Sequence, residues 1–314
     1  QWTVRDALEH IRHFGRDSET LNTVYVVEKG GRLIDDIRMR ELLLTEPDTR
    51  IEELMDHQFI ALAANDDQET AVGVFKRFDR TALPVVDSDG SLVGIVTVDD
   101  VLDIAEAEAT EDFQMLGGAT VLDEPYVTMS FGAMIRRRSV WLILLFFGQM
   151  LTANAMSFYE EQISQALVLT IFLPLIISSG GNSGSQAATL AIRALTRGQI
   201  DVRDWWRVAR RELLAGIVIG LIMGVLGFLR IGIAQLLGGT YGAAWAYVGV
   251  TIGLSLIGVV AWGTLVGALL PLLLKRLGID PATSSTPFVA TLVDVTGIVI
   301  YFSIASVVLG QFLG

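Results

Sequence analysis

The chain has 314 residues, no cysteine and a formal net charge of −12. The absence of cysteine excludes disulfide bonds and thiolate metal sites, and the acidic balance, with no basic stripe, argues against a nucleic-acid partner. The charge is unevenly placed, because residues 1–124 hold 28 of the 35 acidic residues but only 11 of the 23 basic ones. From Ser139 onward, long apolar stretches alternate with short polar connections. This division predicts an acidic soluble region followed by a membrane domain.

Two stretches of the soluble region repeat each other. Residues 23–43 align without gaps on residues 82–102, so that Gly31 falls on Gly90. Each copy follows a helical stretch and predicts a strand, a glycine turn, a second strand and a helix entered through an acidic residue. Two tandem α/β units of this kind resemble a pair of CBS domains, and an unrelated duplicated α/β domain is the alternative. We place the two repeats at residues 1–53 and 54–104.

The CBS resemblance implies a binding site for adenine nucleotides such as ATP. In that family an acidic residue at the start of the helix holds the ribose, and this position carries Glu41 in the first repeat and Asp100 in the second. Asp100 keeps the usual residue, whereas Glu41 is longer. The resemblance therefore implies a nucleotide site more clearly at Asp100 than at Glu41.

An acidic segment, residues 105–130, connects the repeats to the membrane domain. The stretch from Asp103 to Leu116 is a strong helix former, and Glu108, Glu111 and Asp112 share one face of that helix. Like charges at this spacing weaken a helix unless a cation or a basic partner offsets them. An ordinary solvated face is the alternative interpretation.

Five apolar segments are long enough to cross a bilayer. They lie at residues 139–159, 164–195, 209–237, 243–274 and 283–313. Basic residues gather before the first span, between the second and third, and after the fourth, whereas the turn after the first span carries Glu160 and Glu161. By the positive-inside rule the basic end and the acidic region are cytoplasmic and the C-terminus is outside. We expect a multi-pass protein in the lipid of the cell inner (plasma) membrane.

The second span carries helix-weakening residues in its middle, namely Pro174, Gly180, Gly181 and Gly184. Backbone groups freed at this depth must be satisfied by protein or by water in a cavity, so the pattern predicts an interrupted helix at a transport site. Close helix packing through small residues is the alternative. Neutral oxygens for a hydrated ion would come from the neighbouring Asn182, Ser183, Ser185 and Gln186.

Asp294 is the only formally charged residue in the last 34 positions, and it lies inside an apolar run. A charge at that depth costs at least a few kcal/mol, so such a residue normally faces a water-filled path or a partner. No Lys or Arg lies near it in sequence, which makes a cation from solution the first candidate partner. A protonated Asp hydrogen-bonded to a neighbouring helix is the alternative.

The residue types around Asp294 and in the second span are hard oxygen ligands. Mg²⁺ suits one carboxylate per chain together with carbonyl and amide oxygens, because it usually keeps several waters and binds one or two carboxylates. Zinc or copper would need His or Cys, and all three His residues lie in the soluble region.

Three segments carry a specific resemblance, PLIISSGGNSGSQAATLAIRAL, DVRDWWR and DPATSSTPFVATLVDVTGIVIYF. Together they are similar to the MgtE family of Mg²⁺ channels and transporters, and the acidic EAEATED stretch after a CBS pair matches as well. The resemblance implies a multi-domain membrane protein with an α/β CBS-domain pair, a connecting (plug) helix, and an all-α domain of five transmembrane helices at residues 131–314. The acidic helical domain that usually precedes the CBS pair is missing, which, with Gln1 in place of Met, indicates a trimmed chain or a shorter relative.

The resemblance also implies roles for individual residues. Asp294 would hold a hydrated Mg²⁺ in the pore, faced by the carbonyls of Ala290 and Gly181. Ser185 would contribute its side chain where relatives often have Asn or Thr, and Ser178 stands where Gly is common. The family forms homodimers with the pore on the two-fold axis, which would place two copies of Asp294 near one ion.

The expected function is uptake of Mg²⁺ through a selective channel or transporter gated by cytosolic Mg²⁺. Cations bridging the acidic region would hold it compact and the pore closed, and their loss would open it by repulsion. The predicted regulatory ligands are Asp79, Asp99, Asp100, Asp103, Glu108, Glu111 and Asp112.

Two other functions compete with this interpretation. A secondary transporter coupled to Na⁺ or H⁺ would need a further ion site or a proton relay. A CBS-regulated anion channel is disfavoured by the pore acid and by the lack of basic pore residues. An enzyme is not expected, because no nucleophile and base pair stands out.

Overall fold

The computed structural model describes residues 2–118, 127–160, 167–239 and 241–313. The chain divides into two compact units, Gln1–Thr110 and Glu111–Gly314. Part of the predicted connecting segment, Glu161 and the first residues of the predicted second span lie outside the described residues.

The first repeat folds as a helix, a hairpin and a second helix. Helix α1 (Val4–Phe14) precedes the antiparallel strands β1 (Thr23–Val27) and β2 (Leu33–Arg38), and α2 (Met39–Leu44) follows at once. Side chains of a strand alternate between its two faces, and the buried face of β2 packs toward the helices. The core of this repeat consists of Val4, Ala7, Ile37, Leu42 and Ile51.

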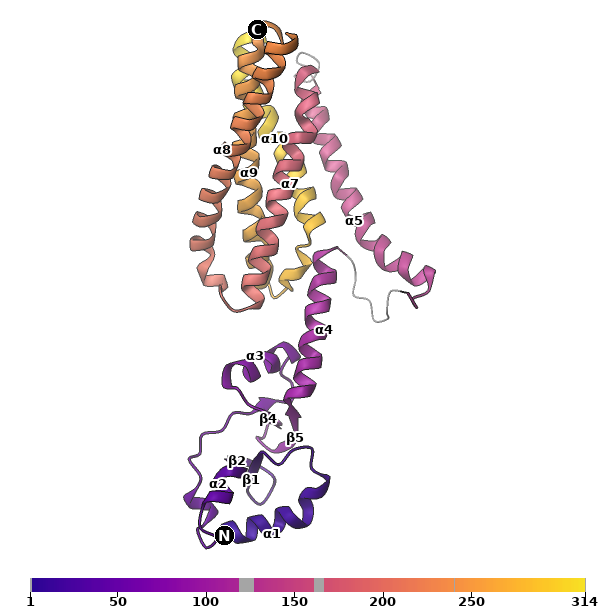
Figure 1. Cartoon of the computed structure of the whole chain (residues 1–314). Coiled ribbons are helices and arrows are strands. Elements are labelled where there is room, and N and C mark those ends of the chain that lie inside the picture. Colours follow the sequence, from indigo (N-terminus) through magenta and orange to yellow (C-terminus); the bar gives the residue numbers. More distant parts are fainter. Residues whose placement is uncertain (1, 119–126, 161–166, 240, 314) are drawn as a thin grey trace. The chain divides into compact units, whose positions relative to one another are not determined.

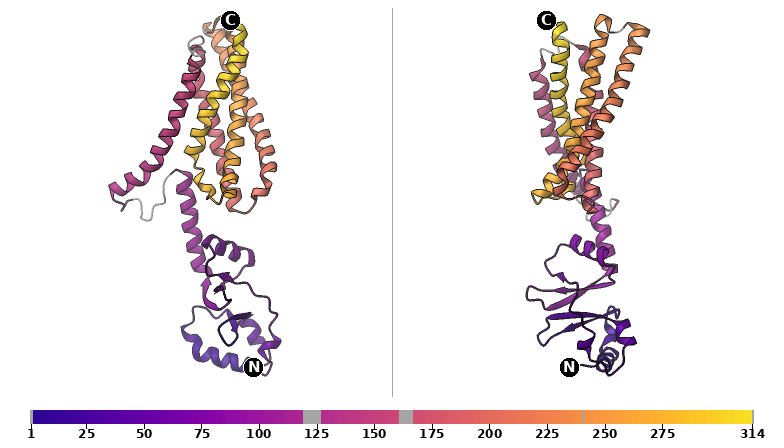
Figure 2. Two further views of the ribbon diagram at one scale, coloured as in Figure 1. Left: turned by 180° about the vertical axis from the view of Figure 1, so that it is seen from behind. Right: turned by 90° about the vertical axis from the view of Figure 1, so that its left-hand side faces the viewer.

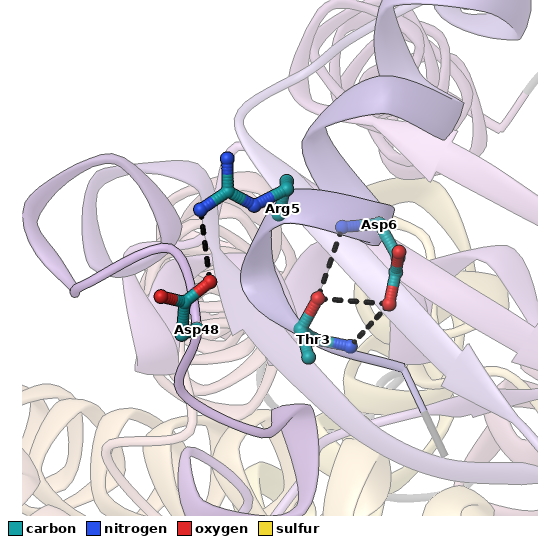
Figure 3. Close-up of polar contacts among 4 residues, drawn as sticks. All are labelled: Thr3, Arg5, Asp6 and Asp48. Atoms are coloured by element: carbon teal, nitrogen blue, oxygen red, sulfur yellow. Dashed lines mark hydrogen bonds and ion pairs between the residues drawn. The ribbon is translucent and has the colours of Figure 1, made fainter.

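Helix α1 begins at a capping box, drawn in Figure 3. The backbone N–H of Asp6 donates to the Thr3 hydroxyl at 3.3 Å, and that of Thr3 donates to the Asp6 carboxylate at 2.8 Å. The bond from Thr3 holds the pKa of Asp6 below its usual value. Arg5 pairs with Asp48 at 2.8 Å, which links the helix start to the segment after α2, although exposure of both side chains keeps the contribution small.

The second repeat has the same order of elements after a short extra strand. Strand β3 (Leu62–Ala63) is followed by α3 (Gln68–Phe78), β4 (Ala82–Val86), β5 (Leu92–Thr97) and α4 (Val98–Leu116). The sheet order is β3-β4-β5, with β3 parallel and β5 antiparallel to β4. Its core consists of Leu62, Ala71, Val72, Phe75, Leu83 and Val101.

The two repeats meet at equivalent glycine turns. The N–H of Leu33 donates to the carbonyl of Gly90 at 3.0 Å, and the N–H of Leu92 donates to the carbonyl of Gly31 at 2.9 Å. Both glycines have positive φ, 87° at Gly31 and 80° at Gly90, a conformation that favours glycine. Because aligned residues exchange these bonds, the predicted repeat and its α/β fold are confirmed.

Helix α4 runs without a break from the second repeat into the predicted connecting helix. The expected boundary between residues 104 and 105 therefore falls inside one helix, since no Gly or Pro interrupts the helix formers there. The helix ends at Leu116, before Gly117 and Gly118, and Gly118 has a φ of 71°.

The second unit contains five helices that are long and apolar enough to cross a membrane within the described part of the chain. They are α5 (Phe131–Phe158), α7 (Leu167–Thr196), α8 (Trp205–Gly238), α9 (Trp245–Arg276) and α10 (Thr286–Leu313). This confirms the predicted five-helix membrane architecture. Helices α7 to α10 form a bundle, whereas α5 lies beside it and diverges from it toward its own N-terminal end (Figures 1 and 2).

Helix α9 is the centre of the bundle and contacts α7, α8 and α10. Within the unit, 56% of the most apolar stretch of α9 is buried, whereas only 6% of that of α5 is buried. Helix α5 packs mainly on α10. The large exposed apolar surface of α5 is therefore available to lipid or to another chain.

Helix α7 is continuous from Leu167 to Thr196, so the prediction of an interrupted second span was wrong. Its glycines instead allow close packing on α9. A methyl group added to Gly263 would lie 2.5 Å from the carbonyl oxygen of Gly180, and one added to Gly267 would lie 2.1 Å from that of Gly184. The alternative of packing through small residues explains these glycines.

Replacing Gly267 with Ala should destabilise the membrane unit, because the new methyl would collide with the backbone of α7. We expect a loss of roughly 1–3 kcal/mol, measured as a lower melting temperature in detergent. Gly253→Ala is the matched control on the same helix, since its added methyl comes no closer than 3.5 Å to another atom. Equal melting temperatures for the two variants would contradict the proposed role of the glycine contact.

Candidate functional site

Three helices meet at the carboxylate of Asp294, which lies in the third turn of α10 and is partly buried. One oxygen, Oδ2, accepts a hydrogen bond from the Gln149 side-chain amide of α5 at 3.2 Å. The other, Oδ1, lies against the backbone of α7, 3.5 Å from where a Cβ would stand on Gly181. A side chain at position 181 would therefore crowd the carboxylate.

Gly181 also faces Ala290, one helical turn before Asp294. The Cβ position of Gly181 is 3.6 Å from the Ala290 Cβ and 3.7 Å from its Cα. The structure thus brings together three of the five predicted pore residues. Since α7 is continuous, the Gly181 carbonyl is used by the helix, and an ion would meet only its second lone pair.

Ser185 and Asn182 lie apart from the carboxylate. The Ser185 hydroxyl donates to the carbonyl of Thr286 at 3.2 Å, and Thr286 precedes Asp294 by eight residues, about 12 Å along α10. The exposed Asn182 amide donates to the Ser178 hydroxyl at 3.3 Å. Ser185 therefore lies nearer the basic end of the unit, whereas Asn182 is on an open part of α7.

Gln149 is a site residue that the sequence analysis missed. Among the described residues it is the one hydrogen-bond partner of the Asp294 carboxylate, and no Lys or Arg forms an ion pair there. The sequence does mark Gln149, because it is a long polar side chain within the apolar run LILLFFGQML. Its contact depends on helix pairing, which the sequence alone does not reveal.

The seam between α5 and α10 holds Gln149 in place. At one end the Trp141 indole donates to the Ser285 hydroxyl at 3.2 Å, and at the other Tyr159 stacks on Phe302 with ring centres 5.2 Å apart. Next to Gln149, the small Gly148 allows close approach, because an added Cβ would be 3.0 Å from the Thr291 methyl.

The acidic side chains predicted to regulate the protein lie along α4 and near it. Asp99, Asp100 and Asp103 lie in the first two turns of α4, and Asp79 ends α3 with a φ of 49°. Glu108 accepts a hydrogen bond from the side chain of Gln68.

Glu111 and Asp112 follow on the same helix, in the part that belongs to the second unit. Among the described residues of the chain, no group of three or more His, Asp or Glu side chains is arranged to hold a metal ion.

The two predicted nucleotide ligands occupy equivalent places. Glu41 and Asp100 both lie in the first turn of the helix that follows the hairpin of their repeat, and both are exposed. The Asp100 carboxylate accepts the Thr97 hydroxyl at 2.8 Å, so it already serves as a link to the strand before the helix.

Both the soluble region and the membrane unit of the chain are similar to known proteins. The membrane unit matches a family model described as "MgtE: Divalent cation transporter" over residues 173–304, and residues 51–107 match a CBS domain model. The chain is 40% identical to the magnesium transporter MgtE of Thermus thermophilus over 98% of its own length, and 33% identical to that of Enterococcus faecalis over 99%. It spans 66% of the length of each of these relatives, slightly less than two thirds.

Solved structures of soluble parts are also similar. The cytosolic domain of the Mg²⁺ channel MgtE in complex with ATP is 42% identical, with a TM-score of 0.32, and the match covers 32% of this chain and 41% of that one. The soluble part of a magnesium transporter is 36% identical, with a TM-score of 0.34, over 34% of this chain and 42% of the other. From the CBS match, the membrane-unit match and the similarity of nearly the whole of this chain to the curated relatives, we conclude that the chain belongs to the MgtE family.

Proposed function

We propose that the chain conducts Mg²⁺ across the cell membrane into the cytoplasm. The observation that carries this proposal is the Asp294 carboxylate inside a membrane helix, with an amide as its partner and no basic side chain paired to it among the described residues. A carboxylate at that depth is costly unless water or a cation accompanies it. Its neighbours Gly181 and Ala290 are the smallest residues, so they bring backbone rather than long side chains next to the carboxylate.

The ligand types favour Mg²⁺ over softer metals. The residues next to Asp294 are Gly181, Ala290 and Gln149, none of which carries a thiolate or an imidazole. Mg²⁺ is usually bound by one or two carboxylates while it keeps several waters. The relatives named as magnesium transporters support the same cation.

A homodimer would complete the site. One chain supplies one pore carboxylate, which is too few ligands for an ion that has lost its water. A two-fold axis beside α7 and α10 would bring a second Asp294 to the same ion. Two carboxylates and shared waters then neutralise the divalent charge.

The basic end of the membrane unit gives the transport a direction. Arg136 to Arg138, the Arg-rich connection between α7 and α8, and Lys275 with Arg276 mark that end as cytoplasmic. Ser185 and Thr286 lie toward it from Asp294. A cation that leaves Asp294 toward the cytoplasm would next meet the Ser185 hydroxyl and neighbouring carbonyls.

We further propose that cytosolic Mg²⁺ closes the pore through the acidic region. Its acids do not form a three-residue metal group among the described residues, so bridging cations would have to join acids of two chains or bind through water. Helix α4 carries most of these acids, and α5 is the next long helix along the chain. Motion of α5 would reach the pore through Gln149, which is bonded to Asp294.

A transporter coupled to Na⁺ or H⁺ is the alternative. It needs a second titratable or ion-binding group within the membrane, and the one other acid in the described membrane helices is Glu212, near the start of α8. That place near one end makes Glu212 a weak candidate for a coupling site, and the channel mechanism is favoured.

Asp294→Asn should remove most Mg²⁺ flux into liposomes, because it takes one charge from each chain at the ion. We expect a fall of at least about tenfold, the size of one lost charge-assisted contact. Glu160→Gln, which neutralises an exposed acid at the end of α5, should conduct like the parent. If Asp294→Asn carried as much Mg²⁺ as the control, Asp294 would not be the residue that binds the transported ion.

Gln149→Leu should raise the Mg²⁺ concentration needed for half-maximal flux, because the carboxylate loses the donor that orients it. We expect a change of roughly threefold to tenfold, equivalent to one hydrogen bond. Gln235→Leu is the control, since Gln235 accepts the N–H of Tyr241 at 2.9 Å on another part of the unit. Identical half-maximal concentrations in the two variants would show that Gln149 does not act on the ion site.

Neutralising acids of α4 should leave the pore conducting when cytosolic-side Mg²⁺ is high, because the bridging ligands are gone. The test variant changes Glu108, Glu111 and Asp112 to their amides. A control with the same change of charge alters Glu19, Glu52 and Glu53, which are absent from the predicted ligands. Flux should be inhibited by millimolar Mg²⁺ in the control only, and equal inhibition in both would contradict gating by α4.

A further inference from the structure

A narrow groove lies on the side of the membrane unit, between α9 and the start of α8. Its volume is about 390 Å³. None of the residues around the Asp294 carboxylate lines it, so it is separate from the candidate cation site. Apolar side chains make up almost the whole wall, and the principal ones are Trp205, Trp262, Leu265, Leu269 and Leu273, with Arg276 at one end.

The groove has the length and the ends that one leaflet of a bilayer requires. Trp262 and Arg276 are separated by about 21 Å along α9, compared with about 15 Å for half the hydrocarbon core. Arg276 is the last residue of α9, and Trp205 is the first of α8. Both therefore lie at the basic end, where headgroups and interfacial Trp side chains are found.

Among the residues that the structure describes, Arg276 is the only charged one that lines the groove, and no acid there is paired with it. Two acids lie in the nearby connection, but each is paired elsewhere, Asp201 with Lys275 at 3.8 Å and Asp204 with Arg207 at 3.3 Å. In the described part of the chain, Arg276 forms no ion pair, and its side chain is exposed. The groove thus combines an apolar wall with one guanidinium group at its end near the membrane surface.

We propose that this groove binds one phospholipid with an anionic headgroup. An acyl chain would lie along Leu265, Leu269 and Leu273, and Arg276 would hold the headgroup phosphate with its paired N–H donors. Basic pockets between membrane helices at the cytoplasmic face are suited to such headgroups. The charge on Arg276 favours this occupant over a second copy of the apolar face, which would bury the guanidinium without a partner.

The bound lipid would also touch a side chain that reaches the pore helix. The Trp262 indole donates to the Thr296 hydroxyl of α10 at 2.9 Å, two residues after Asp294. Lipid in the groove would therefore pack against Trp262 and help to fix its bond to α10.

Native mass spectrometry of the full chain in detergent tests this proposal. Titration with phosphatidylglycerol should show one preferentially retained lipid per chain, and phosphatidylcholine should be retained more weakly. Arg276→Gln should weaken phosphatidylglycerol retention at least about fivefold, the effect of one basic group at a membrane surface. Arg203→Gln, at a neighbouring exposed Arg that does not line the groove, should change it little.

A second variant tests the apolar wall without altering the charge. Leu269→Trp should fill the groove and reduce retention of both lipids, whereas Leu226→Trp, on the exposed face of α8, should not. Equal losses in Arg276→Gln and Arg203→Gln would mean general charge attraction and would overturn the proposal. Unchanged lipid retention in Leu269→Trp would also overturn it. If Leu269→Trp instead converted a dimer to monomers, the groove would be an interface with a second copy of the chain, and the proposal would again be wrong. Lipid retention is read without Mg²⁺ flux, so the result is independent of the proposed conduction.

Discussion

The close contact between α7 and α9 is the constraint on which the membrane unit depends. Gly263 and Gly267 of α9 lie against the carbonyls of Gly180 and Gly184 of α7 so closely that a Cβ on either α9 glycine would clash. This contact fixes the rotation of α7, so the adjacent Gly181 points to α10 and lies beside the Asp294 carboxylate. The glycines therefore act by packing, and the candidate site lies where intact helices meet rather than at a break in one helix.

The neighbours of the Asp294 carboxylate determine what it can bind. Gln149 supplies one hydrogen bond, and Gly181 and Ala290 present only backbone and a methyl group to it. Because Gln149 belongs to α5, which is otherwise weakly packed, the site is sensitive to the position of a helix that follows the acidic region in the chain. Within the membrane unit, this hydrogen bond joins α5 to the proposed pore residue.

Several features could be predicted from the sequence because they are local. The repeat around Gly31 and Gly90 follows from aligned turn residues, the five spans follow from their length and hydropathy, and Asp294 is conspicuous as a lone charge. The continuity of α7 and the contact of Gln149 could not be predicted, because both depend on which helices pack together. Glycines in a membrane helix are compatible with a break or with close packing, and only the neighbouring α9 decides between them.

We propose that two copies of the Asp294 site form a pore for hydrated Mg²⁺ under cytosolic control. Single-channel recording of the chain in a planar bilayer, with Mg²⁺ as the only permeant cation, tests it most directly. We expect discrete currents toward the cytosolic side that disappear when Mg²⁺ on that side is raised. Absence of such currents, with Mg²⁺ flux that instead depends on a Na⁺ or H⁺ gradient, would contradict it.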